Sequence, residues 1–447
     1  MDIKLSDHFT YKKMLLFAAP TIGTVLIAIT YDIIDGYFVS NYIGKTAFAA
    51  VNVIYPLQLL LSVIGYMFGT GGSALIASEL GRENKERANQ VFTMIVKTAF
   101  IFGIFLAALG FIFLPQIAEL MGATPSIMEY GLPYGRTLFL FLPIMIVGYA
   151  FQSLLITAEK PHYGFYLSIA NMLSNIIFDY LFIVEFGWGM VGAAVATGIG
   201  ACINGIFPLV YFSRPNSSAL CFTSWRFEYQ TLLETCSNGL SEMVEDMATS
   251  LIFVFYNIQL LRFMGEDGVA AFGVVIFVEG IFTSVFYALA LEANSVVGYH
   301  YGAKNYDELK NLLKKGVILN LFFGILMYFT AQVAAEWVAE LYVGYDKTVC
   351  ALAIEALKAF ALAFILQGFN SYASAYFTGL NNGKISAVIA FSRTFFIQTA
   401  AIFTLPLIFG AESLWVCQAV AEFISATVGV ALLYRYRKDY CGNKFFP

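Results

Sequence analysis

Residues 98–118, TAFIFGIFLAALGFIFLPQIA, lie between Lys97 and Glu119 and contain no charged side chain. About 20 apolar residues are enough for a helix to cross a bilayer. Similar uncharged runs follow Lys45, Arg136, Glu185, Lys315 and Lys358. These runs are continuously apolar rather than alternating, which predicts membrane-spanning helices and excludes a transmembrane barrel.

The composition of the whole chain agrees with a membrane protein. Of the 447 residues, 59% are hydrophobic and 12% are charged, whereas a soluble globular protein has about 25% charged residues. The basic residues are dispersed, which gives no support to a nucleic-acid partner. The six cysteines and three histidines show no paired spacing, so we expect no metal site, disulfide framework or cofactor.

The apolar segments predict an all-α polytopic protein with twelve transmembrane helices. Their expected ranges are 13–38, 48–79, 89–114, 128–157, 163–184, 191–212, 230–262, 269–298, 311–335, 350–378, 385–409 and 413–435.

The placement of Lys and Arg predicts the orientation of these helices. With both termini inside, the inner segments hold most of the basic residues, and the outer loops hold only Lys45, Arg262 and Lys347. Cytoplasmic loops are enriched in basic residues. We therefore expect a multi-pass protein of the inner (cytoplasmic) membrane, with both termini in the cytoplasm.

The second half of the chain repeats features of the first. Gly81-Arg82-Glu83-Asn84 follows the second expected helix, and Gly302-Ala303-Lys304-Asn305 follows the eighth. We expect two pseudo-symmetric six-helix lobes, residues 1–214 and 230–447, joined by a cytoplasmic linker at 215–229. Transporters built from such parallel repeats commonly place the substrate at the interface of the halves and rock one half against the other.

Four motifs occur in a particular order along the chain. They are Tyr31-Asp32-Ile33-Ile34-Asp35-Gly36-Tyr37, Gly69-Thr70-Gly71-Gly72-Ser73-Ala74, Asn175-Ile176-Ile177-Phe178-Asp179 and Gly298-Tyr299-His300-Tyr301-Gly302. Together they resemble the multidrug and toxic compound extrusion (MATE) transporters of the MOP flippase superfamily. The resemblance covers nearly the whole chain. It implies an ion-coupled exporter that neither forms nor breaks a covalent bond in its cargo.

Two positions depart from the family pattern, and a third matches an expected bend. Asp32 stands where the family has a neutral polar residue, and Glu292 opens a stretch where a glutamine and a proline are usual. Pro20 removes a backbone hydrogen bond and should bend the first helix. The resemblance implies that this bend accompanies ion-coupled movement.

Carboxylates inside a bilayer are costly and are candidates for function by default. Asp32 and Asp35 share one face of the first helix, and Asn175 and Asp179 share one face of the fifth. The resemblance implies that Asp35, Asn175, Asp179 and Thr197 form a cation site in the first lobe. Their oxygen atoms are hard ligands that suit Na⁺ or a proton.

The repeat offers an internal comparison for this site. Aligning Gly44 with Gly265 places Tyr256 opposite Asp35, and aligning Gly187 with Gly410 places Ile402 opposite Asp179. The second lobe therefore lacks both carboxylates. If the acids were scaffold features of a six-helix lobe, both lobes should keep them.

The second lobe has acids of its own at Glu242, Glu279 and Glu292. Together with Tyr256, they are candidates for lining a cavity that attracts cationic substrates. They could equally pair with basic residues or lie near the membrane surface.

We therefore expect a secondary active antiporter in which Na⁺ or H⁺ influx drives the efflux of amphipathic, cationic, drug-like compounds. We expect it to act as a monomer in the lipid bilayer. No phosphate-binding loop is present, so ATP is not the direct energy source. One alternative is a flippase for lipid-linked oligosaccharides or peptidoglycan precursors. A membrane-embedded enzyme would need converging His, Ser or metal-ligand groups, which the sequence lacks.

Overall fold

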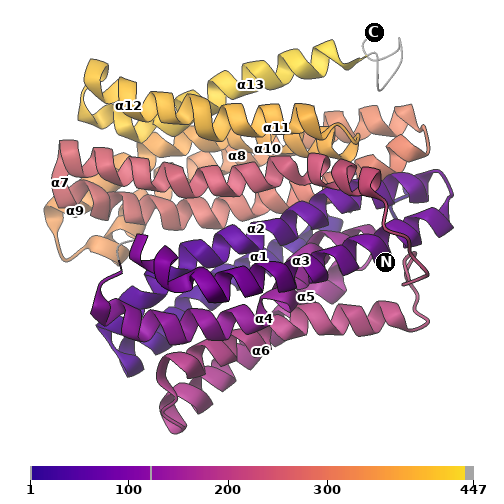
Figure 1. Ribbon diagram of the computed structural model, residues 1–447. Helices are drawn as coiled ribbons and strands as arrows, with labels where there is room; N and C mark the ends of the chain where they lie inside the picture. Colours follow the sequence, from indigo (N-terminus) through magenta and orange to yellow (C-terminus); the bar gives the residue numbers. More distant parts are fainter. Residues whose placement is uncertain (1–2, 121–122, 438–447) are drawn as a thin grey trace. The chain divides into compact units, whose positions relative to one another are not determined.

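The structure, a computed structural model, describes residues 3–120 and 123–437, leaving aside the side chains of Asp32, Asn52, Tyr55, Pro56, Gln58, Leu59 and Ser62. This part of the chain is mostly helical, without a strand (Figure 1). Its helices are α1 (Tyr11–Phe38), α2 (Lys45–Gly81), α3 (Lys85–Leu120), α4 (Pro125–Thr157), α5 (Pro161–Asp179), α6 (Gly189–Ser213), α7 (Tyr229–Gly302), α8 (Tyr306–Val343), α9 (Lys347–Phe360), α10 (Phe364–Gly379), α11 (Gly383–Phe391), α12 (Gln398–Phe409) and α13 (Cys417–Arg435).

In the described residues these helices make twelve long passages, which confirms the predicted count. The backbone of α7 breaks at Gly265 (φ 69°, ψ −158°), so α7 comprises two passages. A short 3₁₀ turn, η3 (Ala361–Ala363), joins α9 to α10, and a π-helical segment, η4 (Ser392–Ile397), joins α11 to α12. Among the described residues, ten helical segments are long and apolar enough to cross a membrane, with both passages of α7 counted as one segment.

Most helices extend a few residues beyond the ranges that hydropathy predicts. Residues 311–335 were the expected apolar span of α8, which in fact begins at Tyr306 and ends at Val343. Its first turn is polar and is capped by Asn305, whose side chain accepts a hydrogen bond from the Glu308 N–H at 3.2 Å. Hydropathy detects only the part of a helix that lies in the lipid, so it misses such capped polar ends.

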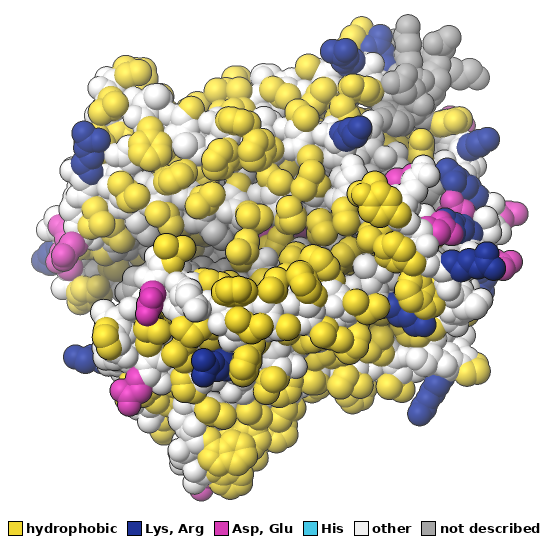
Figure 2. Space-filling model, viewed as in Figure 1, with side chains coloured by type: hydrophobic (Ala, Val, Ile, Leu, Met, Phe, Trp, Pro, Cys, Tyr) yellow, Lys and Arg dark blue, Asp and Glu magenta, His cyan; other side chains and the backbone are white. Residues whose placement is uncertain are grey.

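The outward faces of the helices are apolar. On α3, Ile101, Phe105 and Ile112 are each more than half exposed. Figure 2 shows hydrophobic side chains across the visible face of the molecule, with Lys, Arg, Asp and Glu mostly gathered near the helix ends. A soluble monomer rarely exposes apolar surface on this scale, so the surface matches a bilayer environment.

The chain forms two compact units. Of the described residues, the first unit contains 3–5 and 17–239, and the second contains 6–16 and 240–437. In the second unit the N-terminal segment is held on α8: Glu308 accepts a hydrogen bond from the Phe9 N–H at 2.9 Å, and Lys315 donates one to the Phe9 carbonyl at 2.8 Å. Each unit has its own hydrophobic core.

Left-handed backbone conformations recur at matching places in the two units. Gly44 (φ 127°) pairs with Gly265 (φ 69°), and Gly187 (φ 65°) pairs with Gly410 (φ 87°). The same holds for Glu83 (φ 61°) and Lys304 (φ 54°), and for Glu159 (φ 60°) and Asn381 (φ 56°). Non-glycine residues seldom adopt positive φ. Because these conformations recur in pairs, the backbone supports the repeat. It also supports the alignment that places Tyr256 opposite Asp35.

Pro20 does not interrupt α1, which is helical from Tyr11 to Phe38. The Thr24 hydroxyl donates to the Pro20 carbonyl at 3.1 Å. A bend that accompanies ion-coupled movement at this residue remains a prediction.

Candidate functional site

The first unit brings four of the predicted site residues together. Asp35 near the end of α1 faces Asn175 and Asp179 of α5 and Thr197 of α6. Asn175 and Asp179 are fully buried, and Asp35 and Thr197 are 9% and 7% exposed. Three helices, of which α1 is distant in sequence from α5 and α6, thus direct two carboxyl groups, an amide and a hydroxyl at one point.

The oxygen atoms of this cluster are close but incompletely bonded. The Thr197 hydroxyl donates to Asp35 Oδ1 at 3.5 Å. Both carboxyl oxygens of Asp179 and both polar atoms of the Asn175 amide are buried without a hydrogen-bond partner in the described residues. A buried polar atom without a partner is costly. Such a cluster is therefore suited to accept a small cation or a proton that would bridge its oxygens.

The helices that carry the two aspartates change their winding just beyond them. The π-helical segment η1 (Val39–Ile43) follows α1, and η2 (Tyr180–Glu185) follows α5 directly after Asp179. Each contains a wider turn than an α-helix, and π-helical turns occur frequently at functional sites. Each is followed by one of the paired left-handed glycines, Gly44 or Gly187.

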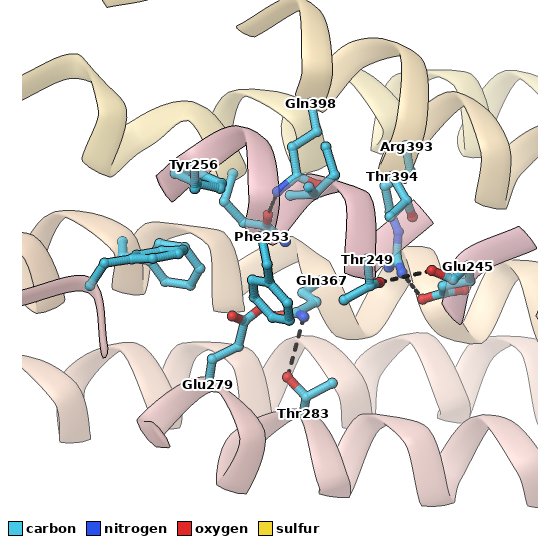
Figure 3. A pocket seen from close by; sticks show the side chains of 14 residues that line it. Glu245, Thr249, Phe253, Tyr256, Glu279, Thr283, Gln367, Arg393, Thr394 and Gln398 are labelled. Carbon is cyan, nitrogen blue, oxygen red and sulfur yellow. Dashed lines mark hydrogen bonds and ion pairs between the residues drawn. The ribbon is translucent and has the colours of Figure 1, made fainter. Parts of the chain in front are cut away.

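The repeat-related positions of the second unit carry no acid. Tyr256, which corresponds to Asp35, is 1% exposed, and Ile402, which corresponds to Asp179, is fully buried. The same alignment relates Asn175 to Gln398. The side chains of Tyr256 and Gln398 line one cavity (Figure 3). A Tyr–Gln pair thus stands where the first unit has an Asp–Asn pair.

The second unit also contains a buried ion-pair network that the sequence analysis missed. Arg393 in η4 forms an ion pair with Glu245 of α7 (Figure 3) and approaches Glu422 of α13 at 3.7 Å. Its side chain is 8% exposed. Glu422 also accepts a hydrogen bond from Asn370 Nδ2 at 2.6 Å. Arg393 and Glu422 are isolated charges within apolar segments, and this signal alone marks them as candidates.

The other predicted residues have different surroundings. Glu279 and Tyr256 line the cavity of Figure 3, while Glu242 lies beside it, near Tyr287 and the ion pair of Arg393. Glu292 is buried elsewhere in α7 and does not line this cavity. Asp32 lies in α1, and its side chain falls outside the described part of the structure.

The polar linker that precedes α7 is fixed to α3. Cys221 N–H donates to Asn89 Oδ1 at 2.9 Å, and Arg87 donates to Glu228 Oε1 at 2.6 Å. The Arg87 guanidinium lowers the pKa of Glu228 from 4.5 to about 2. These contacts give the linker a defined path along the first unit.

Comparison with known proteins relates the chain to characterised families. The MatE family model matches residues 20–181 and 243–404, two stretches of equal length. The multidrug export protein MepA of Staphylococcus haemolyticus is 22% identical over 440 residues, covering 97% of this chain and 95% of MepA. The probable multidrug resistance protein YoeA of Bacillus subtilis is 25% identical over 354 residues, covering 77% of this chain and 76% of YoeA.

A solved structure shares the fold over nearly the full length. It shows the outward-facing conformation of a multidrug resistance MATE family transporter of the MOP superfamily, with a TM-score of 0.89 and 22% identity. The match covers 97% of each chain. Because the family model matches well over half of the sequence, once in each repeat, this twelve-helix membrane protein belongs to the MatE family.

Proposed function

We propose that the chain is a secondary active exporter in which inward movement of Na⁺ or H⁺ drives outward movement of amphipathic, cationic compounds. The observation that carries the proposal is the cluster of Asp35, Asn175, Asp179 and Thr197. Its buried oxygens lack partners, and they are ligands of the kind that small hard cations prefer. The names of the relatives MepA and YoeA, which refer to multidrug export and resistance, support a drug-like cargo.

The chemistry of the cluster allows one site to serve either ion. A proton on one carboxyl group relieves the repulsion between Asp35 and Asp179, and a Na⁺ ion between them would do the same. We therefore expect H⁺ and Na⁺ to compete for the cluster. Uptake of the ion from outside and its release inside would return the cluster to its starting state as cargo leaves by alternating access.

A flippase for lipid-linked oligosaccharides is the alternative from the same superfamily. Its cargo carries phosphate and would favour free cationic side chains in the membrane region. Among the buried side chains of the described residues, the acids Asp35, Asp179 and Glu422 outnumber Arg393, which is the one Lys or Arg in that set. Arg393 is itself engaged by Glu245 and Glu422. This charge balance favours cationic cargo.

Proteoliposomes test the proposal directly. Purified protein is reconstituted, ethidium is supplied as cargo, and a Na⁺ gradient and a pH gradient are imposed separately. We expect at least one of the two gradients to drive ethidium against its concentration gradient. Transport that follows neither gradient, or movement of a lipid pyrophosphate instead of ethidium, would contradict the proposal.

A further inference from the structure

A cavity of about 100 Å³ lies within the second unit, among α7, α9, α10, η4, α12 and α13. Because Tyr256 and Gln398 line it, this cavity is the repeat counterpart of the first unit's oxygen cluster. Roughly 10–15 Å³ of such cavity volume is enough for one water molecule, so the cavity has room for several waters or for one small organic group.

The positive charge beside the cavity is already compensated. Arg393 forms an ion pair with Glu245, approaches Glu422 at 3.7 Å, and donates to the Ser371 hydroxyl at 3.0 Å. An anionic ligand would have to displace these partners and would meet the nearby carboxylates. The electrostatics of the cavity therefore disfavour an anion.

One acid in the cavity wall has no cationic partner. In the described residues no Lys, Arg or His lies within ion-pair distance of Glu279. Its carboxyl group faces Gln367, whose amide nitrogen donates to Thr283 at 3.3 Å (Figure 3). A carboxylate inside a membrane protein usually pairs with a cation or marks a ligand site.

Two further polar atoms in the wall are buried without partners. Gln367 Oε1 and Thr394 Oγ1 have no hydrogen-bond partner among the described residues, and their side chains are 5% and 6% exposed. Both residues line the cavity. Leaving such atoms unpaired costs free energy that a ligand could recover by bonding to them.

Another part of the wall is aromatic. Phe253, Tyr256, Phe272 and Phe360 line the cavity, and the rings of Tyr256 and Phe272 stack with centroids 4.6 Å apart. Aromatic faces attract organic ammonium groups through cation–π interactions. An organic ammonium group with apolar substituents can pack on these aromatic faces, whereas a Na⁺ ion would use only the oxygen atoms of the wall.

We propose that this cavity is a subsite for a small organic cation, an ammonium group with apolar substituents, with Glu279 as its counter-ion and Gln367 Oε1 as its hydrogen-bond acceptor. The inference rests on the proposed function only in taking cationic compounds as cargo. It does not depend on the aspartates of the first unit. Arg393 is engaged by Glu245 and Glu422, which leaves Glu279 as the acid available to the ligand.

Binding of trimethylammonium to the purified full-length protein tests the proposal. Isothermal titration and thermal unfolding are followed with trimethylammonium chloride, with NaCl at equal ionic strength, and with the neutral tert-butanol. We expect saturable binding and stabilisation by trimethylammonium alone. The variant Glu279→Gln should weaken this binding roughly tenfold or more, while Gln367→Glu, which adds a second acid, should strengthen it.

The control is Glu336→Gln, since Glu336 is 75% exposed and pairs with Lys358 at 3.3 Å away from the cavity. It should bind trimethylammonium as the wild type does. If Glu279→Gln does not fold, Gln367→Leu removes the free acceptor without adding charge and should also weaken binding. Unchanged affinity in the folded variants would overturn the proposal, as would absence of saturable binding or an equal response to Na⁺.

Asp179→Asn separates this subsite from the proposed coupling site. It should bind trimethylammonium normally while losing gradient-driven export. If Asp179→Asn exports normally and binding still depends on Glu279, the coupling site is wrong and the subsite stands. If Asp179→Asn loses the binding of trimethylammonium, the independent subsite is wrong.

Discussion

The Thr197 hydroxyl on α6 donates a hydrogen bond of 3.5 Å to Asp35 on α1, across 162 positions of sequence. This contact connects the first helix of the first unit to its last. Asp179 and Asn175 of α5 lie at the same point with unpaired polar atoms. The site thus depends on the packing of three helices, and each helix contributes a group that can be changed on its own.

Asp179→Asn should abolish gradient-driven export while leaving cargo binding intact. The amide keeps the size of the side chain but cannot take up a proton or neutralise Na⁺. Driven transport and counterflow, which needs no gradient, are measured in the same proteoliposomes. Full driven export would contradict the site assignment. Loss of counterflow as well would make Asp179 a cargo ligand rather than a coupling residue.

Tyr256→Phe should disturb ion coupling less than Asp35→Asn, although the two positions correspond in the repeat. Tyr256 is buried in a unit without the paired aspartates, so we expect its hydroxyl to have no role in taking up the coupling ion. Transport driven by Na⁺ and by pH gradients is compared at equal expression. Equal loss in the two variants would show that the ion site is not confined to the first unit.

Single reporter cysteines test the predicted orientation. In a cysteine-free background, reporters at the exposed positions Lys85, Ser217 and Ala303 should resist a membrane-impermeant thiol reagent added to intact cells. Reporters at the exposed Lys45 and Lys347 should react. Labelling of any reporter of the first group from outside would overturn the orientation.

Gly265→Ala should destabilise the protein, and Gly273→Ala should not. A Cβ atom at either position meets no atom within 4 Å, but only Gly265 has a positive φ, at 69°. The positive-φ, extended conformation of Gly265 costs an L-residue about 1–3 kcal/mol, whereas replacing a helical glycine by alanine gains about 0.5–1 kcal/mol. Thermal unfolding in detergent measures both. Equal shifts would mean that the backbone break at Gly265 does not require glycine.

Glu228→Gln should weaken the attachment of the linker to α3 in a pH-dependent way. The pKa of Glu228 falls from 4.5 to about 2 beside Arg87. Because the pKa of Glu228 is lower in the folded state, its ionised form stabilises that state fully at pH values above the unfolded pKa of 4.5. This stabilisation is lost as the pH falls from 4.5 towards 2. The wild type and the variant should therefore differ most near neutral pH. A difference that grows on acidification would contradict this linkage.

The helices were largely predictable because the lipid imposes a simple rule on them. A run such as 98–118 has to be apolar and has to pair its backbone groups internally, so α3 was evident from sequence. The start of α8 was less evident because it depends on capping by Asn305. The boundaries of the two lobes remain predictions from the polar stretch and the repeat.

The candidate site in the first unit was named from sequence by resemblance, and the structure brings its four residues together. The pairing of Arg393 with Glu245 and Glu422 could not be predicted in this way. It joins η4, α7 and α13, which are far apart in sequence, and it depends on how the π-helical segment directs the guanidinium. A lone charge in an apolar run identifies such residues but not their partners.

Because π-helical segments follow Asp35 and Asp179, we expect function to depend on the number of residues in those segments. Each residue of an α-helix turns the chain by about 100°. Deleting one residue from Tyr180–Glu185 would rewind the segment and rotate Asp179 about the helix axis relative to Gly187. The carboxyl group would then leave the cluster although no site residue had been replaced. Insertions and deletions in these two segments should therefore be as damaging as loss of the aspartates themselves.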